Sequence, residues 1–189
     1  MRRALVGVLA LLGAFSVVGC NSNPEPRTEA KRDALQAQAD VALKDMDAKD
    51  PGFRDFVMNR SYGYAVFPSI GAGGLIAGGA HGRGVVYEQG QMIGYANLNQ
   101  ASICLKIGGY TFEEVIVFEN AAAVNRLRAE NLAFEANASA VVLKAGASAA
   151  SKFDHGMEVF VVPTGGLILD GSIGGQKITF ESGHATTQP

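Results

Sequence analysis

The chain has 189 residues, and its 16 lysines and arginines against 18 aspartates and glutamates give a formal net charge of −2. This charge excludes a general nucleic-acid binder, which needs a basic surface. No run of basic residues would hold the chain to an anionic bilayer by charge alone. The length fits one domain with a substantial core.

The N-terminus has the pattern of a bacterial lipoprotein signal peptide. Two arginines precede an uncharged apolar run over residues 4–18, and Gly19 stands directly before Cys20. We predict removal of residues 1–19 and a diacylglycerol on the Cys20 thiol. The alternative, a single transmembrane helix, is disfavoured because a span needs about 20 apolar residues. Loss of the two arginines would leave 14 basic against 18 acidic residues, a net charge of −4.

The segment after the cleavage site is a candidate tether. Residues 20–27 are polar and contain two prolines. Asn21 stands where an aspartate often retains lipoproteins in the inner membrane, so we expect an outer-membrane lipoprotein facing the periplasm. Cys104 would be the one remaining thiol, which excludes an internal disulfide. We expect a single domain over residues 28–183 and a C-terminal tail over 184–189.

Two helices are predicted at the start of the domain. Residues 28–49 begin with Thr28 as a candidate N-cap and place apolar side chains at helical spacing on one face, namely Leu35, Ala39, Ala42, Leu43 and Met46. Asp50, with Pro51-Gly52 after it, ends this helix. Asp50 is also a candidate cap for a short second helix, whose shared face would consist of Phe53, Phe56 and Val57.

From Ser61 onward, short β-branched and aromatic runs separated by glycines predict many short strands. Residues 101–107 alternate apolar and polar side chains, as in a half-buried antiparallel strand. Residues 115–118 are apolar throughout and predict a strand buried on both faces. A third helix is expected from Asn120, its cap, to about residue 131, with inward-pointing side chains at Val124 and Leu127.

The glycines of this region allow two interpretations. Gly74, Gly78 and Gly82 recur at every fourth residue, a spacing that lets membrane helices pack closely. Pro68 and the many glycines disfavour a helix, so we predict strands and hairpin turns. Residues 67–88 and 162–181 also share an order of motifs, and this predicts two copies of a unit with a proline-marked bend, a strand, a glycine turn and a returning strand.

Together these segments resemble the SYLF domain family over about residues 31–182. The residues that carry the resemblance are Gly63-Tyr64-Ala65-Val66-Phe67-Pro68, Gly73-Gly74, Gly78, Gly82, Gly84, the segments 101–108 and 115–118, and Gly165-Gly166-Leu167. The resemblance implies a lipid-binding domain, and eukaryotic relatives bind phosphoinositides. The chain departs from the family pattern because it has no tryptophan and has Lys106 and Tyr110 around Gly108-Gly109, which bears on lipid preference.

No pattern typical of a catalytic or metal site is present. Residues 146–150 lack the last glycine of a nucleophile elbow, and residues 174–177 break the Gly-Lys pair of a phosphate loop. The three histidines are scattered. Glu113 and Glu114 are adjacent, so their carboxylates would point to opposite faces of a strand, and we interpret the pair as a solvent-exposed strand end. We expect no catalysis, no metal and no cofactor.

One cluster of cations is a candidate lipid site. Arg83 lies between two glycines and close to His81, and its guanidinium has the donors to bind a phosphate. The alternative is a surface turn with a solvated arginine. If the two repeated units lie side by side, Lys106 and Lys177 would join Arg83 in a headgroup patch.

The sequence therefore predicts an α+β domain with a largely antiparallel, barrel-like or sandwich sheet, N-terminal helices and one mid-chain helix. We expect non-catalytic binding of membrane lipids, through anionic phospholipid or phosphoinositide headgroups, by a protein anchored through its N-terminal acyl groups. The alternative from another class is a structural envelope protein that binds another protein or assembles with itself. The lipid and the oligomeric state do not follow from the sequence.

Overall fold

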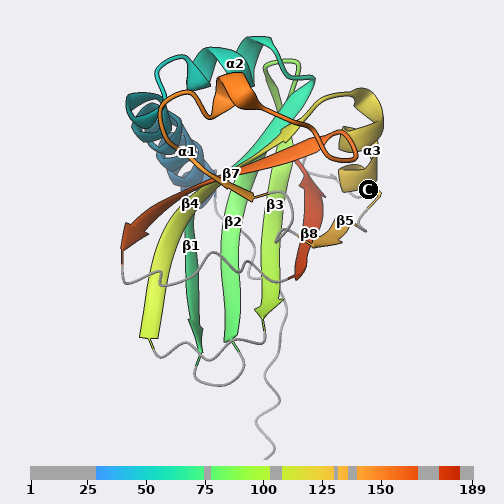
Figure 1. Ribbon diagram of the computed structural model, residues 1–189. Helices are drawn as coiled ribbons and strands as arrows, with labels where there is room; N and C mark the ends of the chain where they lie inside the picture. Colours follow the sequence, from blue (N-terminus) through green and yellow to red (C-terminus); the bar gives the residue numbers. More distant parts are fainter. Residues whose placement is uncertain are drawn as a thin grey trace, which may run out of the picture.

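The computed structural model describes residues 29–74, 78–102, 108–129, 132–135, 140–165 and 175–183 (Figure 1). Several predictions from the sequence lie outside these residues. They are the signal peptide and Cys20, the tether, the Thr28 cap, Cys104, residues 103–107 with Lys106, Gly166-Leu167 and the C-terminal tail.

Helices and strands follow one another in a mixed order. The elements are α1 (Glu29–Lys49), α2 (Phe53–Asn59), β1 (Gly63–Gly74), β2 (Gly78–Glu88), β3 (Gln91–Ser102), β4 (Gly108–Phe118), α3 (Ala121–Arg128), β5 (Leu132–Glu135), β6 (Ala140–Val142), the 3-10 turn η2 (Ser148–Ala150), β7 (Met157–Gly165) and β8 (Gly175–Ser182). The predicted α+β class, with N-terminal helices and one mid-chain helix, is confirmed.

All described strands belong to one sheet, in the order β5-β8-β3-β2-β1-β4-β7-β6. Every pairing is antiparallel except that of β6 with β7. Gln176 on β8 nevertheless donates a hydrogen bond to Glu114 on β4, with 2.9 Å between Nε2 and Oε2. In a flat sheet these strands would be about 19 Å apart. The sheet is therefore strongly curled, so the barrel-like alternative describes it and the two-sheet sandwich does not.

The concave side of this sheet holds one apolar core, which α3 closes at one end. Asn120 caps α3 as predicted, because its side chain accepts from the N–H of Ala123 at 3.1 Å. Val124 and Leu127 of α3 are fully buried. The prediction for residues 115–118 is also confirmed, because Val115 and Val117 belong to the core on the other side of the sheet while Ile116 and Phe118 belong to this one.

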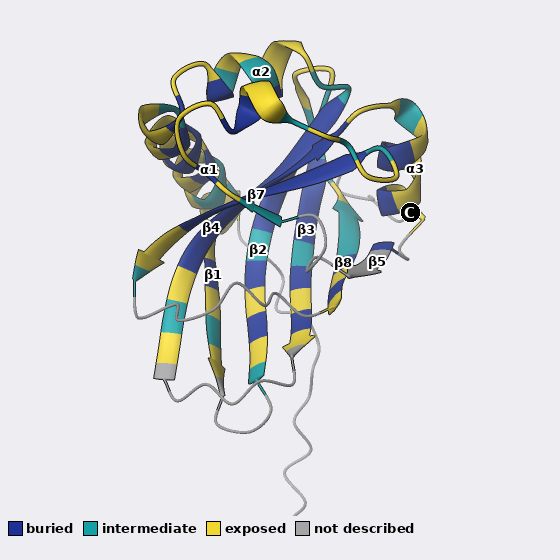
Figure 2. Cartoon of the chain, viewed as in Figure 1, coloured by how far each residue is buried: buried dark blue, intermediate teal, exposed yellow. Residues whose placement is uncertain are grey.

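The convex side is covered by α1 and α2. The apolar face of α1 is buried as predicted, at Ala39, Ala42, Leu43 and Met46. The helix starts above β3, where Gln36 Nε2 donates to Tyr95 Oη at 3.0 Å and the Arg32 guanidinium lies 5.3 Å from the Tyr95 ring centroid. Its last turn, with Asp45 and Lys49, lies beside Glu113 of β4. The helix thus crosses the sheet diagonally, and its covered strand segments are the buried ones (Figure 2).

The cap predicted for α2 is wrong. Asp47 makes the capping contacts, because its Oδ1 accepts from the backbone N–H groups of Gly52 at 3.2 Å and Arg54 at 3.0 Å. Asp50 is buried and turns instead to a distant loop, where it accepts from the N–H groups of Gly146 at 2.7 Å and Ser148 at 2.8 Å. Asp50 is therefore a link between the α1–α2 turn and the η2 loop.

The glycine-rich region forms strands β1 and β2, as predicted. Among the described residues no helix is both long and apolar enough to cross a bilayer. The expected bend at Pro68 is a register shift between Phe67 and Ile70. A Cβ built on Gly84 would lie 2.8 Å from the Phe67 ring, and one on Gly82 would lie 2.5 Å from the Ile70 side chain. These two glycines make room for the side chains that flank the bend.

The prediction of a duplicated unit holds only in part. Residues 67–88 form the expected hairpin of β1 and β2, and the second proline motif also marks a register shift, opposite Thr111 and Phe112. β7 and β8 do not pair, however, because four strands separate them in the sheet. β8 pairs with β3 instead, and its Ile178 joins the concave core beside Leu98.

Candidate functional site

An uncovered polar face lies on the convex side, at the strand ends that α1 and α2 do not reach (Figure 2). Strand register places five residues in one row across five strands. Lys177 of β8 pairs with Asn99, Asn99 with His81, His81 with Gly71 and Gly71 with Thr111. Directly opposite residues point to the same face of a sheet. All five are exposed, so this row, which we call the polar row, is open to a ligand.

Arg83 lies one row closer to α1 on the same face, because it is two residues from His81 along β2. It is half-buried, and its Nε is buried without a hydrogen-bond partner. Its cross-strand neighbour is Asn97, whose Nδ2 donates to Glu181 Oε1 at 2.6 Å. The guanidinium therefore has donor capacity left beside an amide and a carboxylate that bind each other.

The structure brings three of the four predicted cations onto one face. His81 and Lys177 are two strands apart in the polar row, a backbone separation of about 10 Å, and Arg83 lies beside them. Lys106 is outside the described residues. His81 Nδ1 lies 3.0 Å from Asn99 Oδ1, within hydrogen-bond distance.

One part of the sequence interpretation of Arg83 is wrong. Arg83 is inside strand β2 and not in a surface turn. Its flanking glycines face the opposite, concave side, where Phe67 and Ile70 pack against them. They serve packing, and they do not open the backbone to a headgroup.

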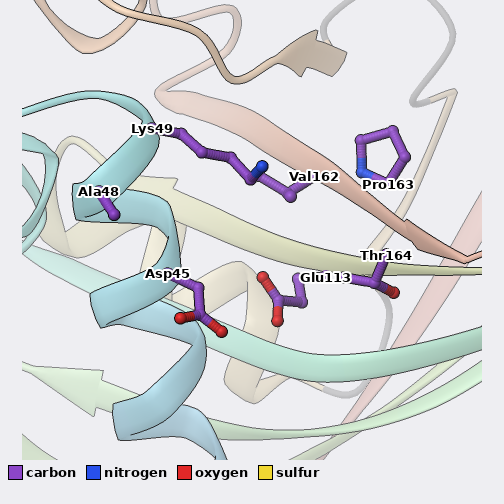
Figure 3. Close-up of a pocket in the computed structure, with 7 residues that line it drawn as sticks. All are labelled: Asp45, Ala48, Lys49, Glu113, Val162, Pro163 and Thr164. Atoms are coloured by element: carbon purple, nitrogen blue, oxygen red, sulfur yellow. The ribbon is translucent and has the colours of Figure 1, made fainter.

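A pocket of about 550 Å³ opens beside the last turn of α1 (Figure 3). Its lining residues are Asp45, Ala48 and Lys49 of α1, Glu113 of β4, and Val162, Pro163 and Thr164 of β7. Glu113 is 7% exposed, and its Oε2 has no hydrogen-bond partner. In Figure 3 the carboxylates of Asp45 and Glu113 face each other across the pocket.

The electrostatics of this pocket centre on Glu113. Burial first, and then the negative charge of Asp45, raise the pKa of Glu113 to about 7, although the positive charge of Lys49 opposes them. Beside the pocket, along β4 and β7, is a second depression of about 400 Å³ over Gly71, Ala72, Gly109, Tyr110, Thr111 and Gly165. Thr164 of the pocket and Thr111 of the depression are joined by a hydrogen bond, in which Thr164 Oγ1 donates to Thr111 Oγ1 at 3.1 Å.

The interpretation of Glu113 and Glu114 as a solvent-exposed strand end is wrong. They do point to opposite faces, as adjacent strand residues must, but both faces are covered. Glu113 lies under α1, and Glu114 is fully buried on the concave side. Two adjacent carboxylates inside an otherwise apolar strand were the one sequence signal for the pocket, and the helix that covers it is more than 60 residues away in sequence.

Comparison with known proteins gives one informative relative. No family model matches the chain. Over 156 residues, 82% of the chain, it is 30% identical to Beta cell expansion factor A from Aeromonas veronii. The chain spans 59% of the length of that relative. The resemblance to the SYLF family stays a prediction.

Proposed function

We propose that this protein is a membrane-anchored, non-catalytic lipid-binding protein that holds anionic headgroups on its uncovered sheet face. The observation that carries the proposal is the register that aligns His81 and Lys177 in the polar row, next to the half-buried Arg83. Guanidinium and ammonium groups bind phosphate oxygens through charge-assisted hydrogen bonds. The SYLF resemblance, which implies lipid binding, supports the same function.

Anchoring at Cys20 is the second part of the proposal. A diacylated cysteine would keep the domain at the periplasmic face of the outer membrane and raise the effective concentration of headgroups around it. Weak headgroup contacts would then suffice. Labelling cells with palmitate tests this step: the wild-type protein should take up label, and a Cys20→Ser variant should not.

Vesicle sedimentation tests the headgroup site. The mature chain with Cys20→Ser should bind vesicles containing phosphatidylglycerol, cardiolipin or phosphoinositide, and it should release them as salt rises, because exposed charges are screened. A basic residue near an anionic surface contributes about 1 kcal/mol, so the double variant R83A/K177A should bind about 30-fold more weakly. The matched control is K144A/K152A, which removes two exposed lysines from the loops around η2.

The outcome also decides between the proposal and its alternative. Equal binding by R83A/K177A and wild type, at equal thermal stability, would reject the headgroup site. Oligomers that grow with protein concentration, without vesicle binding, would favour a structural envelope protein. Val142, which is 56% exposed on edge strand β6, is the residue to substitute first in that case.

A further inference from the structure

We propose that the pocket beside the last turn of α1 is a second site, which binds a phosphoethanolamine group. The ammonium of the ligand lies between the carboxylates of Glu113 and Asp45, and its phosphate contacts Lys49. This site is separate from Arg83, His81 and Lys177, and it does not depend on headgroup binding at those residues.

Glu113 is a buried carboxylate with one oxygen that lacks a hydrogen-bond partner. The side chain is 93% buried, it points into the pocket, and its Oε2 has no partner (Figure 3). A buried carboxylate is normally paired or hydrogen-bonded. Among the described residues neither Asp45 nor Lys49 forms a hydrogen bond or an ion pair with it or with any other residue. The pocket therefore presents an acceptor without a donor.

The acidic residues of the pocket suit an ammonium group better than a metal ion. A metal ion that prefers oxygen takes six or more ligands, and in the described part of the chain no group of three or more His, Cys, Asp or Glu side chains is placed to hold one. A primary ammonium needs only three acceptors. The carboxylates of Glu113 and Asp45, which face each other across the pocket, carry four acceptor oxygens between them.

The other lining residues suit a ligand that also carries a negative charge. Lys49 adds a positive charge at the rim, so the pocket suits a ligand with both a cation and an anion. Ala48, Val162 and Pro163 add apolar surface to the lining, which can cover two methylene groups. A trimethylammonium group has no N–H and is bound by aromatic rings, and the pocket has none among its lining residues. The site should therefore prefer ethanolamine to choline.

Calorimetric titration of the mature chain with phosphoethanolamine tests the site. We expect saturable binding, with phosphocholine at least about tenfold weaker, because it cannot donate to the carboxylates. The variants E113Q and K49Q should each lose about tenfold in affinity for phosphoethanolamine. The matched control K44Q changes an exposed lysine on another part of α1 and should bind as wild type does. R83A/K177A should also bind as wild type does, which separates this site from the headgroup site.

Two further measurements make the test decisive. Wild-type binding should tighten between pH 6 and pH 8, because Glu113, which faces Asp45 and Lys49, must be ionised, and this pH dependence should disappear in E113Q. Vesicles of phosphatidylethanolamine with phosphatidylcholine, compared with pure phosphatidylcholine, distinguish a lipid from a free headgroup as the source. E113Q removes a buried charge and should fold at least as stably as wild type. Equal affinity of E113Q and wild type, or no binding of either form of the ligand, overturns the proposal.

Discussion

Gln176 on β8 donates a 2.9 Å hydrogen bond to Glu114 on β4, although three strands lie between them in the sheet. The contact crosses the concave core, where Gln176 Nε2 also lies 3.5 Å from Gln100 Oε1. Glu114 Oε1 and Gln176 Oε1 have no partner among the described residues. The curled sheet thus encloses a buried pair of polar side chains, each of which has one oxygen without a hydrogen bond.

This pair makes stability depend on pH. Burial raises the pKa of Glu114 to about 8, and the hydrogen bond from Gln176 opposes the rise. Between its ordinary value of 4.5 and about 8, the unfolded chain is ionised while the folded chain keeps its proton. The free energy of unfolding should therefore fall as pH rises through this window, by at most about 1.4 kcal/mol per pH unit for one group.

Urea denaturation at pH 5 and pH 8 measures this effect. The wild type should lose stability from pH 5 to pH 8, and E114Q should lose less. E113Q should also lose less, because the pKa of Glu113 is raised by burial and by Asp45. Identical losses in wild type and E114Q would mean that Glu114 is ionised in the folded protein.

Asp50 should contribute strongly to stability. The variant D50A removes the acceptor of the N–H groups of Gly146 and Ser148, the second of them in a buried position, so it should cost about 2–3 kcal/mol in the free energy of unfolding. Burial raises the pKa of Asp50, but hydrogen bonds from Ser148 and Gly146 outweigh it and lower the pKa below 3.8. Its contribution should be present above pH 3.8 and be lost as pH falls below that value.

Chemical denaturation checks the contribution of Asp50 to stability. D50A and D50N are compared with wild type at pH 7, and the wild type is measured over a series of acid pH values. D50N keeps one acceptor oxygen and should be the milder change. An unchanged denaturation midpoint in D50A would contradict the link between the α1–α2 turn and the η2 loop.

A methyl group at Gly84 should be costly. Its Cβ would lie 2.7 Å from the carbonyl oxygen of Val66 and 2.8 Å from the Phe67 ring, inside the concave core. Overpacking of this kind destabilises by about 1–3 kcal/mol. Gly71 is the matched control on the neighbouring strand, because a Cβ there meets nothing within 4 Å. The melting temperature of G71A should stay near that of wild type, and an equal drop in both variants would contradict overpacking at Gly84 as the cause.

The Asp47 cap of α2 is the fourth prediction. D47A removes the acceptor for two backbone N–H groups at the start of the helix, and loss of such a cap costs about 1 kcal/mol. A cap substitution at Asn120, which accepts from the N–H of Ala123, should cost a similar amount and serves as the reference. Thermal denaturation compares the melting temperatures of D47A and N120A with that of wild type. An unchanged melting temperature in D47A would mean that the Asp47 side chain does not stabilise the start of α2.

Local patterns predicted the elements that are determined locally. The face of α1 at Ala39 and Met46, the cap at Asn120 and the doubly buried strand over 115–118 all follow from spacing within one segment. The cap of α2 does not follow from local spacing, because the N–H groups that donate hydrogen bonds to Asp50 are about 100 residues further along the chain. Local sequence cannot reveal such a competitor.

The candidate sites were predictable to different degrees. Arg83 and Lys177 were named from residue type, but their shared face depends on β8 pairing with β3, and the duplicated motif suggested that β8 would pair with β7. The sequence does not predict a site at Glu113, because this residue is buried by α1 and β7, which are remote from it in sequence. Residue type therefore predicts which side chains could bind a ligand, but it does not predict which of them lie close together across the sheet.

The position of β8 has a consequence for how the chain folds during synthesis. β8 is the last described strand, yet it lies inside the sheet between β5 and β3. In the described structure β5 pairs with no other strand. Until residues 175–182 arrive, β3 is therefore an open edge, β5 has no partner, and Glu114 has no donor. A chain that emerges N-terminus first would present that edge to other chains until its final segment was free.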